Sequence, residues 1–406
     1  MGNFTVLEKK VYRDKPFEAG FGCWKCVSDY TSSKGTELFE VNSDVAGCDR
    51  YDNYMVRFSA DNGANWGEES LTLRRKELGR GFVQRICEFY QGLDPHSDTV
   101  LRFYDSGVNN DNNLMSEAEK AELNARGIDY KESYTDEGLV DFSHNASGVC
   151  SYSTDGGRTF SEEINLKKVF AESGLGSCFP LFSCQHLTPL PDGSLCITAY
   201  DAEGKGGAGV IKLKITDGKF NWDARFIGKS EYVPGIFLNE GSTALLPDGR
   251  LVVMFRCDPQ AGGRDVKRKW IAVSEDGGES WSKLTEWCYT DGRPVISPGS
   301  QPRLFCNPDG RLFFIGTIAE CEDFDAWTGR NTLTMMEIDT DTLRAKSDSR
   351  IAVDCRQPED HPYVAISNFS TLFDRVSGNL HIFAPRAYNR AVELEDTILM
   401  KYTIGF

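Results

Sequence analysis

Short apolar runs separated by tight polar turns repeat along this chain. In the clearest unit, residues 238–281, the apolar runs 241–246, 251–255 and 270–273 each have the length of a strand. Pro247-Asp248-Gly249 joins the first two runs, and this combination is typical of a tight hairpin turn. A few short strands cannot bury both of their faces alone, so the unit predicts a repeated all-β architecture.

Counterparts of this turn occur at a nearly constant period. Gly193, Gly249, Gly310 and Gly378 follow one another at intervals of 56, 61 and 68 residues, and earlier turns are expected at 33–35 and 94–98. Six such hairpins predict an all-β, six-bladed β-propeller that forms one domain over residues 1–406. We expect a strand at 4–11 to pair with the last strand at 397–404, because closing the ring removes free sheet edges.

A second turn, Ser-x-Asp-x-Gly-x-x-aromatic, occurs at 59–66, 153–160 and 274–281. Its aspartate can accept backbone N–H bonds within the turn, and its glycine can adopt a positive φ. The wide gap before Gly193 predicts an insertion over 106–146 in the second blade. Ser116-Glu117-Ala118-Glu119 is a capping-box pattern, so we expect a short helix there, either as surface decoration or as a lid or subunit contact.

Composition limits the partners of the chain. A net charge of −16 and a pI near 4.9 argue against nucleic acid or an anionic membrane surface, and an anionic substrate would need a local basic pocket. There is no run of 18 apolar residues, so no membrane-spanning helix is expected. The chain has 13 cysteines, an odd number, and shows no secretion signal, so free thiols and a cytoplasmic location are expected. The pair Cys23 and Cys26 stands alone and the histidines lack ligand spacing. We therefore expect no metal and no cofactor; the oligomeric state stays open.

The repeated aspartate turns in a six-unit β chain resemble the Asp boxes (BNR repeats) of the sialidase, or neuraminidase, superfamily. A closer match is Asn239-Glu240-Gly241 followed by Phe255-Arg256, which resembles the sialidase segment carrying a catalytic glutamate and, sixteen residues later, a carboxylate-binding arginine. The resemblance implies a six-bladed propeller whose aspartate turns lie away from the active site. It also implies that Glu240 is catalytic, that Arg256 binds substrate, and that both face a central pocket.

The remaining sialidase positions are matched less closely. Lys25 stands near the first of the three sialidase arginines, and a lysine lacks the bidentate fork of a guanidinium. Candidates for the third arginine are Arg330, with Arg303 and Arg386 as alternatives. The acid/base aspartate is best matched by Asp49, with Asp44 and Asp52 as alternatives.

The tyrosine nucleophile of sialidases has no counterpart in the best local match, Ala365-Ile366-Ser367-Asn368-Phe369, where Ile366 takes its place. Tyr363 and Tyr388 are near only in sequence. Isoleucine cannot attack an anomeric carbon, so we expect that this is not an ordinary retaining sialidase.

Aligning the blades on their turns gives an independent view of the axis. Glu240 then corresponds to Cys184 and Gln301, and Arg256 corresponds to Tyr200, while His186 lies close to Cys184. A carbohydrate is the expected substrate, and three functions remain open. The first is a glycoside hydrolase acting on an acidic or polar sugar, in which Glu240 and Asp49 share the acid and base roles. The second is a uronic-acid lyase that uses His186 and Tyr200, and the third is a glycan-binding propeller without catalysis.

Overall fold

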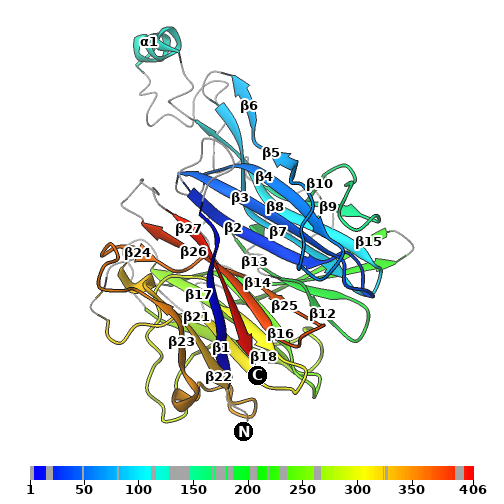
Figure 1. The fold of residues 1–406 in the computed structure, drawn as a ribbon, viewed down its shortest axis with the longest axis vertical. Helices are drawn as coiled ribbons and strands as arrows, with labels where there is room; N and C mark the ends of the chain where they lie inside the picture. The colour runs from blue at the N-terminus through cyan, green and yellow to red at the C-terminus, as the bar shows by residue number, and fades with distance from the viewer. Residues whose placement is uncertain are drawn as a thin grey trace.

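Six antiparallel sheets make up the protein, as the computed structural model shows (Figure 1). The structure describes residues 4–14, 22–47, 50–79, 82–110, 116–127, 147–166, 169, 180–181, 186–201, 208–216, 219–228, 236–259, 267–322, 324, 328–388 and 397–406. The first strands of neighbouring sheets contact one another, as β16 does with both β12 and β20. The predicted six-bladed β-propeller is therefore confirmed.

Each of the first three blades contains a four-stranded meander. Blade 1 consists of β2 (Gly22–Tyr30), β3 (Leu38–Gly47), β4 (Arg50–Ser59) and β5 (Ser70–Arg74). Blade 2 consists of β7 (Phe82–Asp94), β8 (Thr99–Asn110), β9 (Ser147–Ser153) and β10 (Ile164–Asn165), with β6 (Lys76–Gly79) on the other edge of β7. Blade 3 has two short first strands, β11 (Pro180–Leu181) and β12 (Thr188–Pro189), then β13 (Leu195–Asp201), β14 (Ala208–Thr216) and β15 (Lys219–Gly228).

The other three blades repeat this arrangement. Blade 4 consists of β16 (Ile236–Leu245), β17 (Leu251–Pro259), β18 (Lys269–Ser274) and β19 (Thr285–Glu286). Blade 5 consists of β20 (Arg303–Cys306), β21 (Leu312–Thr317), β22 (Thr332–Ile338) and β23 (Ile351–Cys355), with the 3-10 turns η2 (Thr328–Arg330) and η3 (Ser347–Ser349). Blade 6 begins with β24 (Val364–Ala365) and β25 (Ser370–Phe373), followed by β26 (Leu380–Tyr388) and β27 (Ile398–Gly405).

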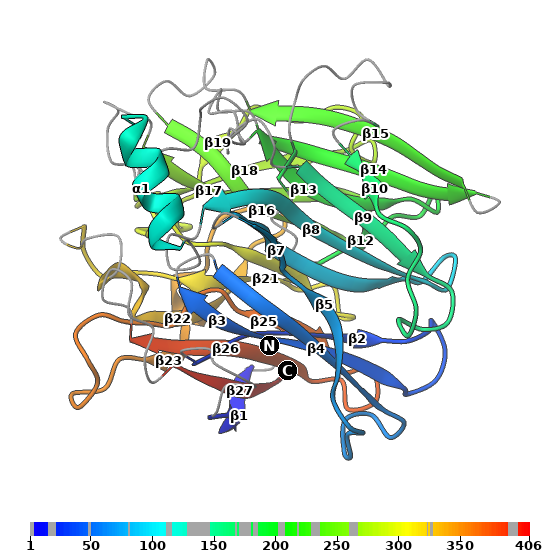
Figure 2. The same ribbon diagram turned by 90° about the horizontal axis from the view of Figure 1, so that it is seen from above.

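The N-terminal strand completes blade 6. Strand β1 (Thr5–Arg13) pairs antiparallel with β27, and the two run side by side in Figures 1 and 2. Just before β1, Phe4 is only 6% exposed, and its ring meets that of Phe313 on blade 5 edge to face at 5.0 Å. The predicted closure of the ring is confirmed, and the closing segment also contributes to the core between blades 5 and 6.

Both kinds of turn form as their chemistry predicts. Gly249 has φ +89°, which lets the chain reverse between β16 and β17. In the turn after β18, Asp276 accepts from the Ser280 backbone at 2.9 Å, while the buried Ser274 hydroxyl accepts from the Gly278 N–H at 2.7 Å. Strand β16 runs from Glu240 to the first of these turns, and β18 runs in the same direction to the second. Both turns therefore lie at the end of the blade opposite Glu240.

The helix is α1 (Glu117–Ala125), and both hydrogen bonds of the Ser116–Glu119 capping box are present. In Figure 1 it stands beyond the end of the sheets. Strand β8 continues to Asn110, so the first part of the range 106–146 is strand rather than insertion. Within the described residues, no helix is long and apolar enough to cross a membrane, and each cysteine whose side chain is described is a free thiol.

Candidate active site

Glu240 and Arg256 meet at a bulge in blade 4. Strand β16 begins earlier than the apolar run predicts. Between the pairs Leu238–Cys257 and Gly241–Phe255 the register shifts, so that Asn239 and Glu240 together lie opposite the single residue Arg256. The bulge turns the Glu240 carboxylate toward the next strand, where its Oε2 lies 2.5 Å from Arg256 Nη1. The two residues thus form an ion pair across the hairpin.

A second carboxylate completes the arrangement around this arginine. Asp258 follows Arg256 by two residues, so both side chains lie on the same face of β17. Asp258 Oδ2 is 2.9 Å from Arg256 Nη2 and accepts from Asn239 Nδ2 at 2.7 Å. The guanidinium is thus held between two carboxylates, and these two ion pairs raise the pKa of Arg256 although burial opposes the shift.

A lysine lies directly behind this group. Lys269 on β18 pairs in register with Arg256, is fully buried, and donates from Nζ to the Pro298 carbonyl at 2.6 Å. Burial, reinforced by the Arg256 charge, lowers the pKa of the Lys269 ammonium to about 7. Sequence alone gives no signal for this burial, because a lysine at the start of a strand is normally solvated.

The segment before β20 forms one wall of the site. A side-chain carbon on Gly299 would stand 2.3 Å from Asp258 Oδ1, so only glycine allows the backbone to approach this closely. The Gly299 carbonyl accepts a hydrogen bond from Arg330 Nη2. Arg330 therefore lies next to the group around Arg256, where it helps to hold the wall.

The first strand of blade 6 passes beside the same region. Gln301 Nε2 donates to the Phe369 carbonyl at 3.0 Å, and the backbone N–H of Ile366 donates to the Arg330 carbonyl at 2.8 Å. Ile366 and Phe369 are both buried, whereas Tyr363 is 37% exposed and contacts the His361 ring. Ile366 and Phe369, in the segment between β24 and β25, thus pack their side chains into the core between blades 5 and 6, and it is the Ile366 backbone that contacts Arg330.

Three other predicted positions are located less completely. Lys25 is half-buried on β2 opposite Ser43, one bulge away from the pair between Cys23 and the buried Asp44. Asp49 lies outside the described residues. Asp52 is a residue of β4 and Tyr200 a residue of β13.

His186 lies deeper in the propeller than the position equivalent to Glu240. The pairs Pro189–Leu195 and Leu245–Leu251 are the last ones before the hairpin turns of blades 3 and 4, so Pro189 is equivalent to Leu245. Glu240, five residues before Leu245, is then equivalent to position 184, and His186 lies two residues closer to the turn. Its Nε2 lies 2.6 Å from Arg303 Nη1. The structure therefore groups His186 with Arg303 and not with Glu240.

Arg386, the other alternative for the third arginine, belongs to the junction of blades 5 and 6. Its Nη1 lies 2.6 Å from Asp354 Oδ2, and its Nη2 pairs with Asp360. The same Asp354 accepts from Tyr402 and from Lys9 of β1. Arg386 thus ties the closing strand to its neighbours, and Arg330 is the candidate whose contacts lie next to Arg256.

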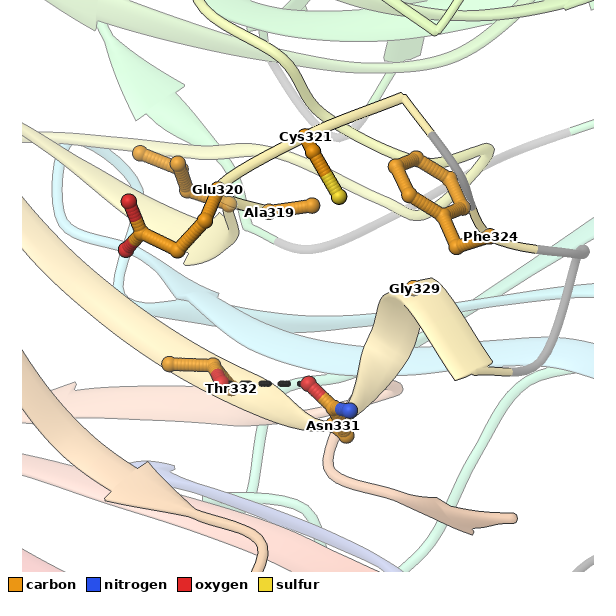
Figure 3. A pocket seen from close by; sticks show the side chains of 8 residues that line it. Ala319, Glu320, Cys321, Phe324, Gly329, Asn331 and Thr332 are labelled. Carbon is orange, nitrogen blue, oxygen red and sulfur yellow. Dashed lines mark hydrogen bonds between the residues drawn. The ribbon is translucent and has the colours of Figure 1, made fainter. Parts of the chain in front are cut away.

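A cavity of about 280 Å³ is lined by the residues on either side of Arg330, Gly329 and Asn331. Figure 3 shows the side chains of Cys321 and Phe324 on one side of it and Gly329 of η2 on the other. Asn331 and Thr332, joined by a 3.1 Å hydrogen bond, form its floor. Among the described residues, no group of three or more His, Cys, Asp or Glu is placed to hold a metal ion.

Comparison with known proteins identifies the fold. No protein-family model and no curated protein matches the chain. Among solved structures, a leech intramolecular trans-sialidase matches with 13% identity and a TM-score of 0.64 over 98% of this chain and 70% of that one. The chain has the six-bladed β-propeller fold of the sialidases.

Two further structures show how widely this fold is shared. A protein of unknown function from Dyadobacter fermentans covers the chain fully in both directions, with 13% identity and a TM-score of 0.62. An α-L-arabinanase from Penicillium chrysogenum has 13% identity and a TM-score of 0.55 over 99% of this chain and 98% of that one. At these identities the likeness establishes the sialidase-like fold, and the activity has to be argued from the site.

Proposed function

We propose that the protein is a glycoside hydrolase with Glu240 as a catalytic carboxylate. The observation that carries this proposal is the bulge that turns Glu240 toward Arg256 at the end of the blade away from the hairpin turns. Glu240 as a residue is 8% exposed, and the hydrogen bond from Arg256 fixes the direction of its carboxylate. The fold neighbours include enzymes that act on sugars, a trans-sialidase and an arabinanase, which supports a carbohydrate substrate.

The contacts favour a polar sugar over sialic acid. Arg256 already has two carboxylate partners, Glu240 and Asp258, so its charge is neutralised before any substrate arrives. Lys25 offers a point charge where sialidases have a forked guanidinium. The buried Ile366 and Phe369 supply no nucleophile on blade 6.

In the proposed reaction, water adds across the glycosidic bond. Glu240, an ion-paired carboxylate, takes a proton from the attacking water as the C–O bond breaks, and the leaving oxygen receives a proton from an acid. Asp49 is our candidate for that acid, only because its place in the sequence matches that of the acid/base aspartate of sialidases. Asp258 and Asn239 act as positioning residues, since they hold Arg256 and thereby Glu240.

A substrate panel tests this proposal. Aryl glycosides report hydrolysis by the released chromophore, and uronic-acid oligosaccharides report a lyase by the absorbance of an unsaturated product. We expect chromophore release from at least one neutral or weakly acidic glycoside. An unsaturated product would indicate the lyase, and glycan binding without turnover on any substrate would indicate a binding propeller.

A further inference from the structure

A buried arginine lies on the propeller axis, below the level of Glu240. Arg303 is the first residue of β20, is only 7% exposed, and donates from Nε to Thr371 Oγ1 on blade 6 at 3.0 Å. Its Nη1 meets His186 Nε2 on blade 3 at 2.6 Å. A single guanidinium thus joins β20 to β25 of blade 6 and to the segment before β12 of blade 3.

The partners of Arg303 are neutral. Because an arginine can only donate, His186 Nε2 accepts, so the imidazole is uncharged with its proton on Nδ1. Within the described part of the chain, no carboxylate forms an ion pair with Arg303, in contrast to Arg256, which has two. Burial lowers the pKa of the Arg303 guanidinium to about 9, which still leaves it charged at neutral pH. The charges of Tyr90 and Asp29 oppose this shift without forming an ion pair with the guanidinium, so burial of this cation remains costly in free energy.

Arg303 lines a cavity of about 240 Å³ between blades 3, 4 and 5. The cavity walls are mixed: the polar side chains of His186 and Thr188 lie beside Arg303, and the apolar part is formed by Leu187, Pro189, Ala244, Leu245, Leu304 and Phe305. Three of the less buried lining residues, Pro189, Leu245 and Cys306, each stand two residues before a hairpin turn. The cavity therefore opens at the turn end of the axis, away from Glu240.

We propose that this cavity is a second binding site, which takes a small organic carboxylate with an apolar body. The planar guanidinium matches a carboxylate, and the incoming anion compensates the buried charge. The apolar walls receive the rest of the ligand, and about 150 Å³ is already enough for a benzene ring. Inorganic phosphate fits less well, because it has no apolar body to place against Leu187, Leu245 and Phe305.

Benzoate is the probe, and Cys306 is the reporter. Cys306 lines the cavity and is half-buried, whereas Cys321 is exposed in the loop beside η2. Alkylation of each cysteine in the intact protein is followed by peptide mass spectrometry. We expect saturating benzoate to slow alkylation of Cys306 at least about fivefold and to leave Cys321 unchanged.

Variants assign the effect to the arginine. Arg303→Met should weaken benzoate binding, measured by calorimetry, about 10- to 100-fold, the usual value of a charge-assisted hydrogen bond. Arg256→Lys, at the other end of the axis, should leave protection of Cys306 unchanged. Benzyl alcohol at the same concentration should not protect Cys306.

Three results would overturn the proposal, and all can be read from the wild-type protein if Arg303→Met fails to fold. Equal protection by benzyl alcohol would mean an apolar cavity without anion recognition. Protection by phosphate at lower concentration than benzoate would mean an inorganic anion site. No protection by benzoate at tens of millimolar would mean that Arg303 only fills the axis.

Discussion

Truncating Phe4 tests whether the N-terminal segment is part of the cooperative ring. Phe4→Ala removes a ring that is 6% exposed and that meets Phe313 at 5.0 Å. Burial of a phenylalanine stabilises by about 2–3 kcal/mol, and an edge-to-face aromatic pair adds about 0.5–1.5 kcal/mol. We therefore expect a loss of about 3 kcal/mol in the free energy of unfolding.

The expected shift in melting temperature follows from the chain length. An unfolding entropy of about 2.1 cal/mol/K per residue amounts to about 0.85 kcal/mol/K for 406 residues. A loss of about 3 kcal/mol then lowers the melting temperature by about 3–4 °C. Leu7→Ala is the matched control, because Leu7 lies on β1, three residues after Phe4, and is 59% exposed, so its effect should stay within about 0.5 kcal/mol.

Calorimetry gives the melting temperatures, and urea unfolding followed by tryptophan fluorescence gives the free energies. If Phe4→Ala behaves like Leu7→Ala, the segment before β1 lies on the ring without stabilising it. A separate early transition for β1 would likewise contradict closure as part of one cooperative unit.

Three further outcomes are expected. Lys269 titrates near 7 when folded and near 10.4 when unfolded, so the unfolded chain holds the extra proton between these values. The stability of wild type relative to Lys269→Met, from urea unfolding, should therefore rise between pH 7 and 9 by up to about 1.4 kcal/mol per pH unit; a flat difference would place the ammonium in water. Ser274→Ala should lower the free energy of unfolding by about 1–3 kcal/mol, since it leaves the Gly278 N–H without its acceptor, whereas Glu275→Ala on the exposed turn should change it by less than about 0.5 kcal/mol. A fluorogenic sialoside should release negligible product, because Ile366 cannot act as a nucleophile; turnover at about 1 s⁻¹ or faster would show that another residue does.

Much of the architecture could be predicted from local signals. Turn glycines such as Gly249 and Gly310 mark one hairpin per blade, and their period sets the number of blades. The helix was predictable from the capping box at Ser116 for the same reason, since both features depend on residues close together in sequence. The pairing of Glu240 with Arg256 was predictable because one hairpin contains both.

The rest of the site depends on contacts between distant segments. Asp258 could have been found from strand alternation, because it follows Arg256 by two residues. Nothing local indicates that Lys269 is buried or that Gly299 packs against Asp258, since both depend on how β18 and the segment before β20 meet β17. The sequence indicates Arg303 only as a possible substrate arginine, because its axial position depends on the arrangement of blades 3, 5 and 6.

The central claim is that Glu240 performs chemistry, and one comparison of turnover numbers tests it most directly. On the best glycoside from the panel, kcat is measured for wild type, Glu240→Gln and Glu275→Gln. Glu275 is an exposed glutamate on the turn at the far end of the same blade, so it controls for the loss of one negative charge.

We expect Glu240→Gln to lower kcat by about 10²–10⁴-fold, the usual contribution of a positioned acid/base group, with a melting temperature near that of wild type. Glu275→Gln should retain wild-type turnover. A Glu240→Gln protein that turns over at the wild-type rate would contradict the proposed role of this carboxylate.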